Sequence, residues 1–204
     1  MTRKVCHLVA VLLCLHATPA STQDGMLGLP LVLREGGWAR YVGQSSEGPS
    51  TFVFKVGPSD THGGQRARWL LLEVDVPATG RVTLEFLVKG EVFSADKVLL
   101  TRVRVPGQAP QDASDVFADM GRPAGWKARV IRQGTERAAG RELLVTEYSF
   151  PAGLTATWSS TVPGVGLVQV SGPEPFQLVA FGVGGDPWKG VVTAAQWPAS
   201  PAPK

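Results

Sequence analysis

The stretch from Leu154 to Val170, LTATWSSTVPGVGLVQV, holds two alternating segments and the clearest turn signal in the sequence. Alternate residues such as Ala156 and Trp158 share one side of an extended chain, which is the period-2 pattern of a half-buried strand. Pro163-Gly164 suits the central positions of a type II turn, where glycine accepts a positive φ. The stretch therefore predicts an antiparallel meander, which a further strand over 176–183 extends.

Earlier segments show the same alternation, most clearly RVTLEFLVK at 81–89. The turn sequence PATG at 77–80 predicts a hairpin between this strand and the preceding one. Polar, glycine-containing sequence predicts a loop over 57–65 and a turn that contains Gly134. The other predicted strands are a first strand region over 31–33 and 37–42, and then 51–56, 68–76, 97–105, 126–133 and 141–150.

One helix is predicted, over Asp112–Gly121, with Asp112 as the N-cap and Gly121 as the stop. About ten strands exceed what an open twisted sheet holds without curling. We therefore predict a mainly β fold, a single strongly bent antiparallel sheet (a half-barrel) of about ten strands with one short helix on its concave side.

The first twenty residues have the pattern of a secretory signal peptide. Arg3 and Lys4 precede an apolar run over 5–15, and small residues end the segment at Ala20. We expect a signal peptide over 1–20, a single β-rich domain over 26–197 and a disordered, proline-rich tail over 198–204. The alternatives for the first segment are a membrane anchor and an ordinary first helix. The mature chain is expected in the periplasm or outside the cell, with no integral membrane span.

Both cysteines, Cys6 and Cys14, lie in this first segment. Leu13 stands where a lipoprotein signal has a small residue, so lipid anchoring at Cys14 is not expected. Removal of the segment leaves no thiol for disulfides, catalysis or metal binding. It also takes two of the 20 basic residues, against 17 acidic ones. The mature chain is thus nearly neutral, and without a basic and aromatic cluster we expect no nucleic-acid partner.

Three segments together resemble a broad set of exported bacterial proteins. They are GGWARY at 36–41, Trp69 with Glu73 in one strand, and WSSTVPGVGLV at 158–168. In these proteins the two end motifs bracket a bent sheet similar to the periplasmic lipoprotein-carrier (LolA-like) superfamily. The resemblance implies a half-open barrel whose concave face, covered by a helix, takes an acyl chain. It transfers no catalytic residue.

Four apolar residues are candidates for contact with such a ligand: Trp69, Leu84, Phe86 and Trp158. The competing interpretation is that large inward side chains on strands fill the core. Glu73 and Asp75 share one side of a strand and have the residue types of a glycosidase acid and base. A solvated or arginine-paired face accounts for them more simply, so no catalytic residue is assigned.

No cofactor or metal is expected, because His62 is the only histidine of the mature chain and no cysteine can join it. Three function classes remain. The first is a periplasmic binding protein for a lipid, an acyl chain or another apolar molecule. The second is a structural or interaction protein of the envelope with a self-filled concavity and an exposed edge or patch for a protein partner. The third is a hydrolytic enzyme, for which the sequence offers no catalytic constellation.

Overall fold

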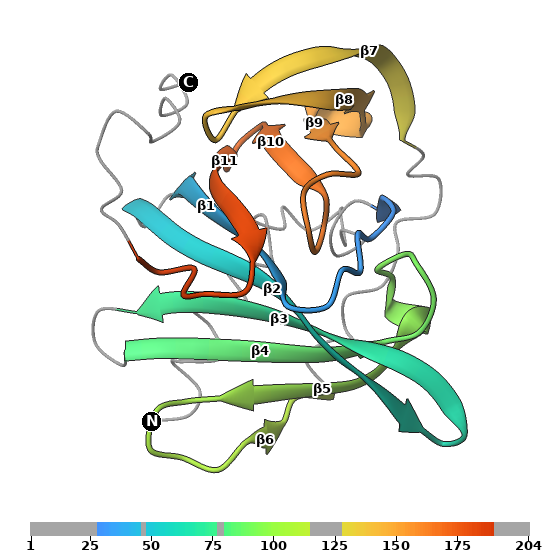
Figure 1. Ribbon diagram of the computed structural model, residues 1–204, viewed down its shortest axis with the longest axis vertical. Coiled ribbons are helices and arrows are strands. Elements are labelled where there is room, and N and C mark those ends of the chain that lie inside the picture. Colours follow the sequence, from blue (N-terminus) through green and yellow to red (C-terminus); the bar gives the residue numbers. More distant parts are fainter. Residues whose placement is uncertain (1–27, 46–47, 77–79, 115–127, 190–204) are drawn as a thin grey trace.

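The computed structural model describes residues 28–45, 48–76, 80–114 and 128–189. Its strands are β1 (Gly37–Ser45), β2 (Gly48–His62), β3 (Gln65–Val76), β4 (Gly80–Val88), β5 (Val98–Arg104), β6 (Gln111–Asp112), β7 (Arg129–Ala138), β8 (Arg141–Ser149), β9 (Thr155–Trp158), β10 (Leu167–Ser171) and β11 (Phe176–Val183). All eleven belong to one sheet, in the order β6-β5-β4-β3-β2-β1-β11-β10-β9-β8-β7 (Figure 1). The predicted single antiparallel sheet of about ten strands is confirmed.

Each half of the chain runs as a meander, and the halves meet where β1 pairs with β11. Gly37 lies opposite Val183, and Tyr41 lies opposite Leu178. In Figure 1, β3 to β5 run across the view whereas β10 and β11 run steeply through it, so the sheet is strongly twisted and bent. The edge strands β6 and β7 do not pair with each other, and the sheet is open.

Strands β2 and β3 continue past their neighbours as a two-stranded arm, seen at the lower right of Figure 1. The pairing of β1 with β2 ends at Lys55, and that of β4 with β3 begins at Arg68. Beyond these points β2 and β3 pair with each other as far as His62 opposite Gln65. The prediction of a loop over 57–65 is wrong. Most of the arm is exposed on both faces. Polar residues therefore follow one another along it, and the sequence shows no alternation of apolar and polar residues that would predict a strand.

Strand β7 runs through Gly134, which lies opposite Val145 of β8. The prediction of a turn at Gly134 is therefore wrong. The chain reverses instead at Ala139 and Gly140, which both have positive φ, 49° and 74°. Two consecutive residues of positive φ are what a two-residue hairpin loop requires. Alanine seldom takes this conformation, so the sequence did not mark the turn.

Most of the predicted helix over Asp112–Gly121 lies outside the described residues. Asp112 itself ends β6, and its carboxylate accepts hydrogen bonds from the amide (2.8 Å) and the hydroxyl (2.6 Å) of Ser114. These bonds hold the pKa of Asp112 below its usual value. The described part of the chain contains almost no helix, with short 3₁₀ turns at Ala95–Lys97 and Pro151–Gly153. No helix in the described ranges is long and apolar enough to cross a bilayer.

The core lies on one face of the sheet, which we call the inner face. Cross-strand pairing places Phe54, Leu72 and Leu84 in one row on this face. Tyr41 is fully buried beside them, and its hydroxyl donates a hydrogen bond of 2.9 Å to the carbonyl of Leu167. Burial raises the pKa of the Tyr41 hydroxyl above its ordinary value. The inner-face residues of the first four strands are Ala39, Tyr41, Phe52, Phe54, Val56, Leu70, Leu72, Val74, Val76, Val82, Leu84, Phe86 and Val88.

Candidate functional site

Residues 28–33, which we call the strap, lie against the inner face. The amide of Leu31 donates to the carbonyl of Glu91 at 2.7 Å. Val32 and Gly164 exchange both of their backbone hydrogen bonds, at 2.8 and 3.0 Å. The strap therefore sits between two other segments as a short, isolated strand, held by bridges rather than by a continuous ladder.

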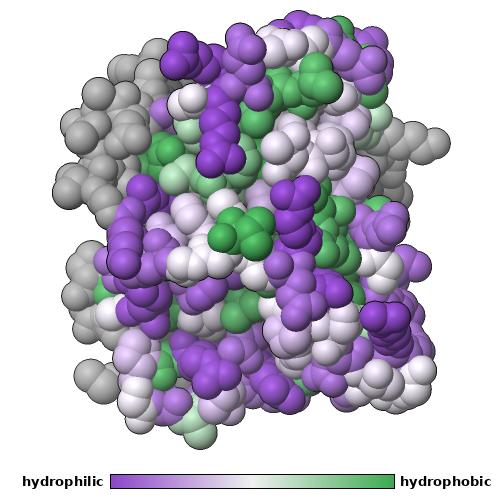
Figure 2. Space-filling model, viewed as in Figure 1, coloured by the Kyte–Doolittle hydropathy of each residue, from purple (hydrophilic) through white to green (hydrophobic). Residues whose placement is uncertain are grey.

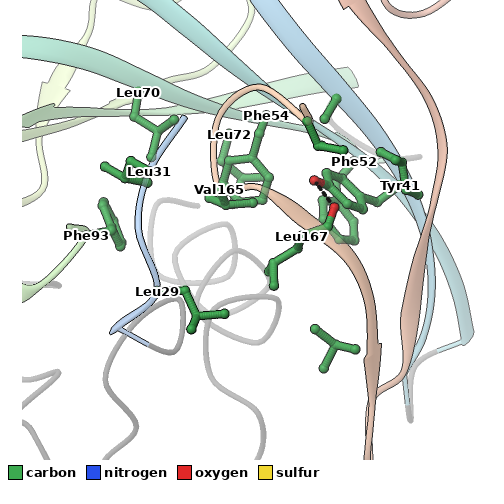
Figure 3. Close-up of a cluster of buried hydrophobic side chains, with 14 of the residues drawn as sticks. Leu29, Leu31, Tyr41, Phe52, Phe54, Leu70, Leu72, Phe93, Val165 and Leu167 are labelled. Atoms are coloured by element: carbon green, nitrogen blue, oxygen red, sulfur yellow. Dashed lines mark hydrogen bonds between the residues drawn. The ribbon is translucent and has the colours of Figure 1, made fainter. Parts of the chain in front are cut away.

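The leucines of the strap fill the space above the inner face. Leu29 and Leu31 are only 4% and 8% exposed. Figure 3 shows them gathered with Leu70 of β3 and with Phe93 in a cluster of buried side chains. The side chains of the protein itself therefore occupy this part of the concave side.

A second irregular segment, residues 159–166, links β9 to β10 and also packs on the core. The amide of Ser159 donates to the carbonyl of Gly166 at 2.8 Å and closes the segment. Gly164 has a φ of +83°, as the predicted turn at this position requires. Val165 is 3% exposed and belongs to the core cluster. The stretch from Leu154 to Val170 thus also supplies the partner of the strap, Gly164.

Two of the four predicted ligand-binding residues, Leu84 and Phe86, lie on the inner face of β4. They are 2% and 1% exposed. The ring of Phe86 meets that of Phe93 edge to face, with centroids 5.2 Å apart. Both side chains are packed against the chain itself, and a role for them in ligand binding stays a prediction.

The two predicted tryptophans lie in different environments. Trp158 packs against the core cluster, and its indole Nε1 donates to the carbonyl of Pro30 in the strap at 2.9 Å. Trp69 points to the opposite, outer face, because its neighbour Leu70 lies on the inner face. There its Nε1 donates to Asp60 at 3.1 Å, and the Arg102 guanidinium lies 5.2 Å from its ring centroid. The fold brings together Leu84, Phe86 and Trp158 on the core side but not Trp69.

The outer face carries a cluster that sequence reasoning missed. Glu73 of β3 has a side chain only 11% exposed, and its Oε1 accepts a hydrogen bond from Lys55 Nζ at 2.9 Å. Its Oε2 accepts one from Trp188 Nε1 at 2.7 Å. The Arg81 guanidinium lies 4.1 Å from the centroid of the Trp188 ring. Residues 184–189, which we call the latch, thereby bind across the outer face.

A second contact fixes the latch to β1, since Arg40 Nη1 donates to the carbonyl of Lys189 at 2.8 Å. Within the latch, Asp186 accepts a hydrogen bond from the amide of Trp188 at 3.0 Å. Asp75, which shares with Glu73 the residue types of a glycosidase acid and base, is exposed and lies opposite Arg81. Both oxygens of Glu73 are engaged by Lys55 and the latch. Glu73 and Trp188 lie 115 residues apart in the sequence, so no local pattern could have indicated this contact.

Strand β7 forms a ten-residue edge of the sheet. Val130 and Ile131 in β7 are 51% and 45% exposed, and Leu144 in the adjacent β8 is 76% exposed. Figure 2 shows apolar residues at the surface in the upper part of the molecule, where Figure 1 places β7 to β9. The segment 126–133 was predicted as a strand, but alternation along one strand does not tell whether that strand is an edge.

The edge also carries an ion-pair cluster on one face of the hairpin. Arg132 Nε donates to Glu147 of β8 at 2.9 Å, and its Nη2 donates to Glu136 at 3.1 Å. These bonds raise the pKa of Arg132 above its ordinary value. Among the described residues, no three His, Cys, Asp or Glu side chains are grouped to hold a metal ion. His62 is exposed at the tip of the arm.

No family model matches the sequence, and no curated protein matches it. A solved structure of MucB is 15% identical, with 80% of this chain and 58% of that chain covered and a TM-score of 0.37. A structure of the MucA/MucB complex of Pseudomonas aeruginosa is also 15% identical, with 78% of this chain and 55% of that chain covered and a TM-score of 0.37. A candidate lipoprotein of Parabacteroides distasonis is 10% identical, with 76% of this chain and 99% of that chain covered and a TM-score of 0.37.

The chain spans little more than half the length of the MucB chains that it matches. At TM-scores this low, fold and function have to be assigned from the geometry of this chain alone. Membership of the LolA-like superfamily stays a prediction.

Proposed function

We propose that this chain is a non-enzymatic, exported interaction protein of the cell envelope, which binds an extended polypeptide segment along β7, an edge strand among the described residues. The observation that carries the proposal is a contrast between two surfaces. Inner-face side chains such as Leu84 and Phe86 are buried by the chain itself, whereas the ten-residue edge strand exposes Val130 and Ile131. A protein that works through an empty apolar hollow would show the reverse.

The backbone of an edge strand supplies the binding energy in this mode. Every second residue of β7 directs its N–H and C=O groups away from β8, where an added strand can pair with them. The opposite edge of the sheet, β6, has only two residues, so it offers a much shorter template. Val130 and Ile131 would gain burial against side chains of the added strand.

The second candidate function is binding of an acyl chain or another apolar molecule on the inner face, where the strap now lies. One observation favours it. The strap is held through Leu31, Val32 and Trp158 by a few hydrogen bonds rather than by a continuous ladder. Segments of this kind open at a lower free energy than the sheet that they cover. An acyl chain would then replace Leu29 and Leu31 on the inner face.

The test of the first function uses synthetic ten-residue peptides with alternating apolar and charged residues as probes. We expect a subset to bind and to slow amide hydrogen exchange within β7. The double variant Val130→Lys, Ile131→Lys should lose this binding. Val183→Lys is the matched control, since Val183 is 57% exposed but lies in β11, away from the edge. Failure of every peptide to protect the β7 amides would overturn the proposal.

A fluorescent fatty acid tests the second function on the same purified protein. Binding that accelerates hydrogen exchange at Leu31 and Val32 would favour ligand carriage under the strap. No binding, together with peptide protection of β7, supports the interaction protein. Export itself is tested by sequencing the N-terminus of the secreted product, which we expect to begin shortly after Ala20.

A further inference from the structure

The inference concerns the partner of β7 and rests on the function proposed above. We propose that β7 pairs in antiparallel fashion with β7 of a second copy of this chain. The two-fold axis passes through Gly134, and Arg132 of each copy faces Glu136 of the other.

The charges that this pairing would bring together lie on one face of the sheet. That face carries every second residue of β7 over Arg132, Gly134 and Glu136, together with Glu147 of β8. Arg132 already bonds Glu147 and Glu136 within its own chain, at 2.9 and 3.1 Å. A guanidinium has five N–H donors. These two bonds leave donors on Arg132 for a carboxylate that approaches from beyond the edge.

The positions of the charges select one register. A two-fold axis at Gly134 places Arg132 opposite Glu136 twice, once in each copy. An axis at Gln133 would instead place Arg132 opposite Gly134, and an axis at Thr135 would place it opposite Ala138. A shift of one residue in either direction therefore removes the charge pairing.

Charged residues on an edge usually prevent strands from pairing at random. In this register Arg132 and Glu136 favour one partner instead, because each of them meets the opposite charge on the second copy.

The dimer should be weak. One strand pair buries less surface than the interface of a stable dimer, so the complex belongs to the transient class. Association should therefore appear as a mass that rises with protein concentration rather than as a fixed dimer. It should also extend the sheet across the two copies and slow amide exchange in β7.

The test is sedimentation of the mature protein over about a hundredfold range of concentration, with two charge variants. Glu136→Arg and Arg132→Glu each place like charges across the axis, and each should dimerise at least about tenfold more weakly than the unmodified protein. Mixed in equal amounts, the two variants pair Glu with Arg at both positions, so a heterodimer should form. Glu142→Arg is the matched control, because it makes the same charge change as Glu136→Arg one strand away from the edge.

A second variant does not depend on the ion pairs within the chain. Gly134→Cys places two thiols opposite each other on the axis, and mild oxidation should join the two copies, whereas Arg137→Cys should not react in this way. Unmodified protein that stays monomeric throughout, or a Glu136→Arg variant that dimerises undiminished, would overturn the inference. If peptides still protect β7 in a strictly monomeric protein, the inference fails while the proposed function stands. If peptides also fail, both fall.

Discussion

The indole of Trp158 lies directly across Gly166, with no room for a side chain between them. A Cβ at Gly166 would overlap the indole Nε1 and would lie 2.7 Å from Cδ1. Gly166 also has a φ of +69°, a backbone conformation that residues with a side chain rarely adopt. The same indole donates to Pro30 in the strap. One ring thus couples the segment between β9 and β10 to the cover of the inner face.

Gly166→Ala should destabilise the protein by about 2–4 kcal/mol. Roughly 1 kcal/mol of this comes from the positive φ, and the rest from displacement of the Trp158 ring. Gly185→Ala separates the two causes, since Gly185 has a φ of +74° but nothing within 4 Å of its Cβ position. Urea unfolding of both variants measures the difference. Equal losses in the two would show that the ring is not held against Gly166.

Stability should fall at high pH because of Tyr41. The ordinary pKa of tyrosine is 10.0, and burial raises the pKa of Tyr41 in the folded state. The unfolded chain therefore loses this proton first. The contribution of the un-ionised Tyr41 hydroxyl to the free energy of unfolding is fully present below about pH 10 and falls above it by about 1.4 kcal/mol per pH unit. Tyr41→Phe should cost about 1 kcal/mol at neutral pH through loss of the bond to Leu167.

The measurement is the free energy of unfolding between neutral pH and about pH 11 for both proteins. Other groups titrate in this range, so the difference between the unmodified protein and Tyr41→Phe is the informative quantity. That difference should shrink as pH rises above 10. A constant difference across the range would contradict an un-ionised, buried Tyr41.

The strands could be predicted where apolar and polar residues alternate along the chain. The alternation of Val82, Leu84 and Phe86 with polar residues predicted β4, although the structure buries both faces of this strand. The turn sequence at 77–80 predicted its hairpin with β3. The pairing of β1 with β11 could not be predicted in this way, because it joins the two ends of the fold. It brings together residues such as Gly37 and Val183, which are far apart in the sequence.

The candidate site was harder to predict than the sheet. The segment RWLLLEVDV in β3 is apolar at both parities, so periodicity could not decide whether Trp69 or Leu70 faces the core. A side chain that completes a core has the same sequence pattern as one that lines a cavity, as Phe86 illustrates. The outer-face site at Glu73 depends on Trp188, a residue in the sequence-distant latch.

The contact between Glu73 and Trp188 should contribute measurably to stability. Trp188→Phe keeps an aromatic ring for Arg81 but removes the donor to Glu73 Oε2, and we expect a loss of about 1–2 kcal/mol. Glu73→Gln should also destabilise, because Lys55 loses its partner. In the double variant the losses should fall short of their sum by about 0.5–2 kcal/mol, since the two residues share one hydrogen bond.

Asp75→Asn is the matched control for Glu73→Gln. It changes a carboxylate to an amide on the same strand and face, but at an exposed position, so its effect should stay within about 0.5 kcal/mol. Thermal unfolding of the set gives the comparison. Additive losses for Glu73→Gln and Trp188→Phe would mean that the latch does not rest on this carboxylate.

The strap should open more readily when Trp158 loses its donor. Trp158→Phe leaves a ring over Gly166 but cannot bond the Pro30 carbonyl, so global stability should fall by about 1 kcal/mol. Amide exchange at Val32 should accelerate beyond what the global loss explains, because local opening becomes less costly. Trp38→Phe is the control, since its indole donates in the same way to the carbonyl of Gly184 but lies on the outer face of the sheet, opposite to the strap. Equal acceleration at Val32 in both variants would mean that the strap opens only when the whole sheet unfolds, and a ligand could then not enter beneath it.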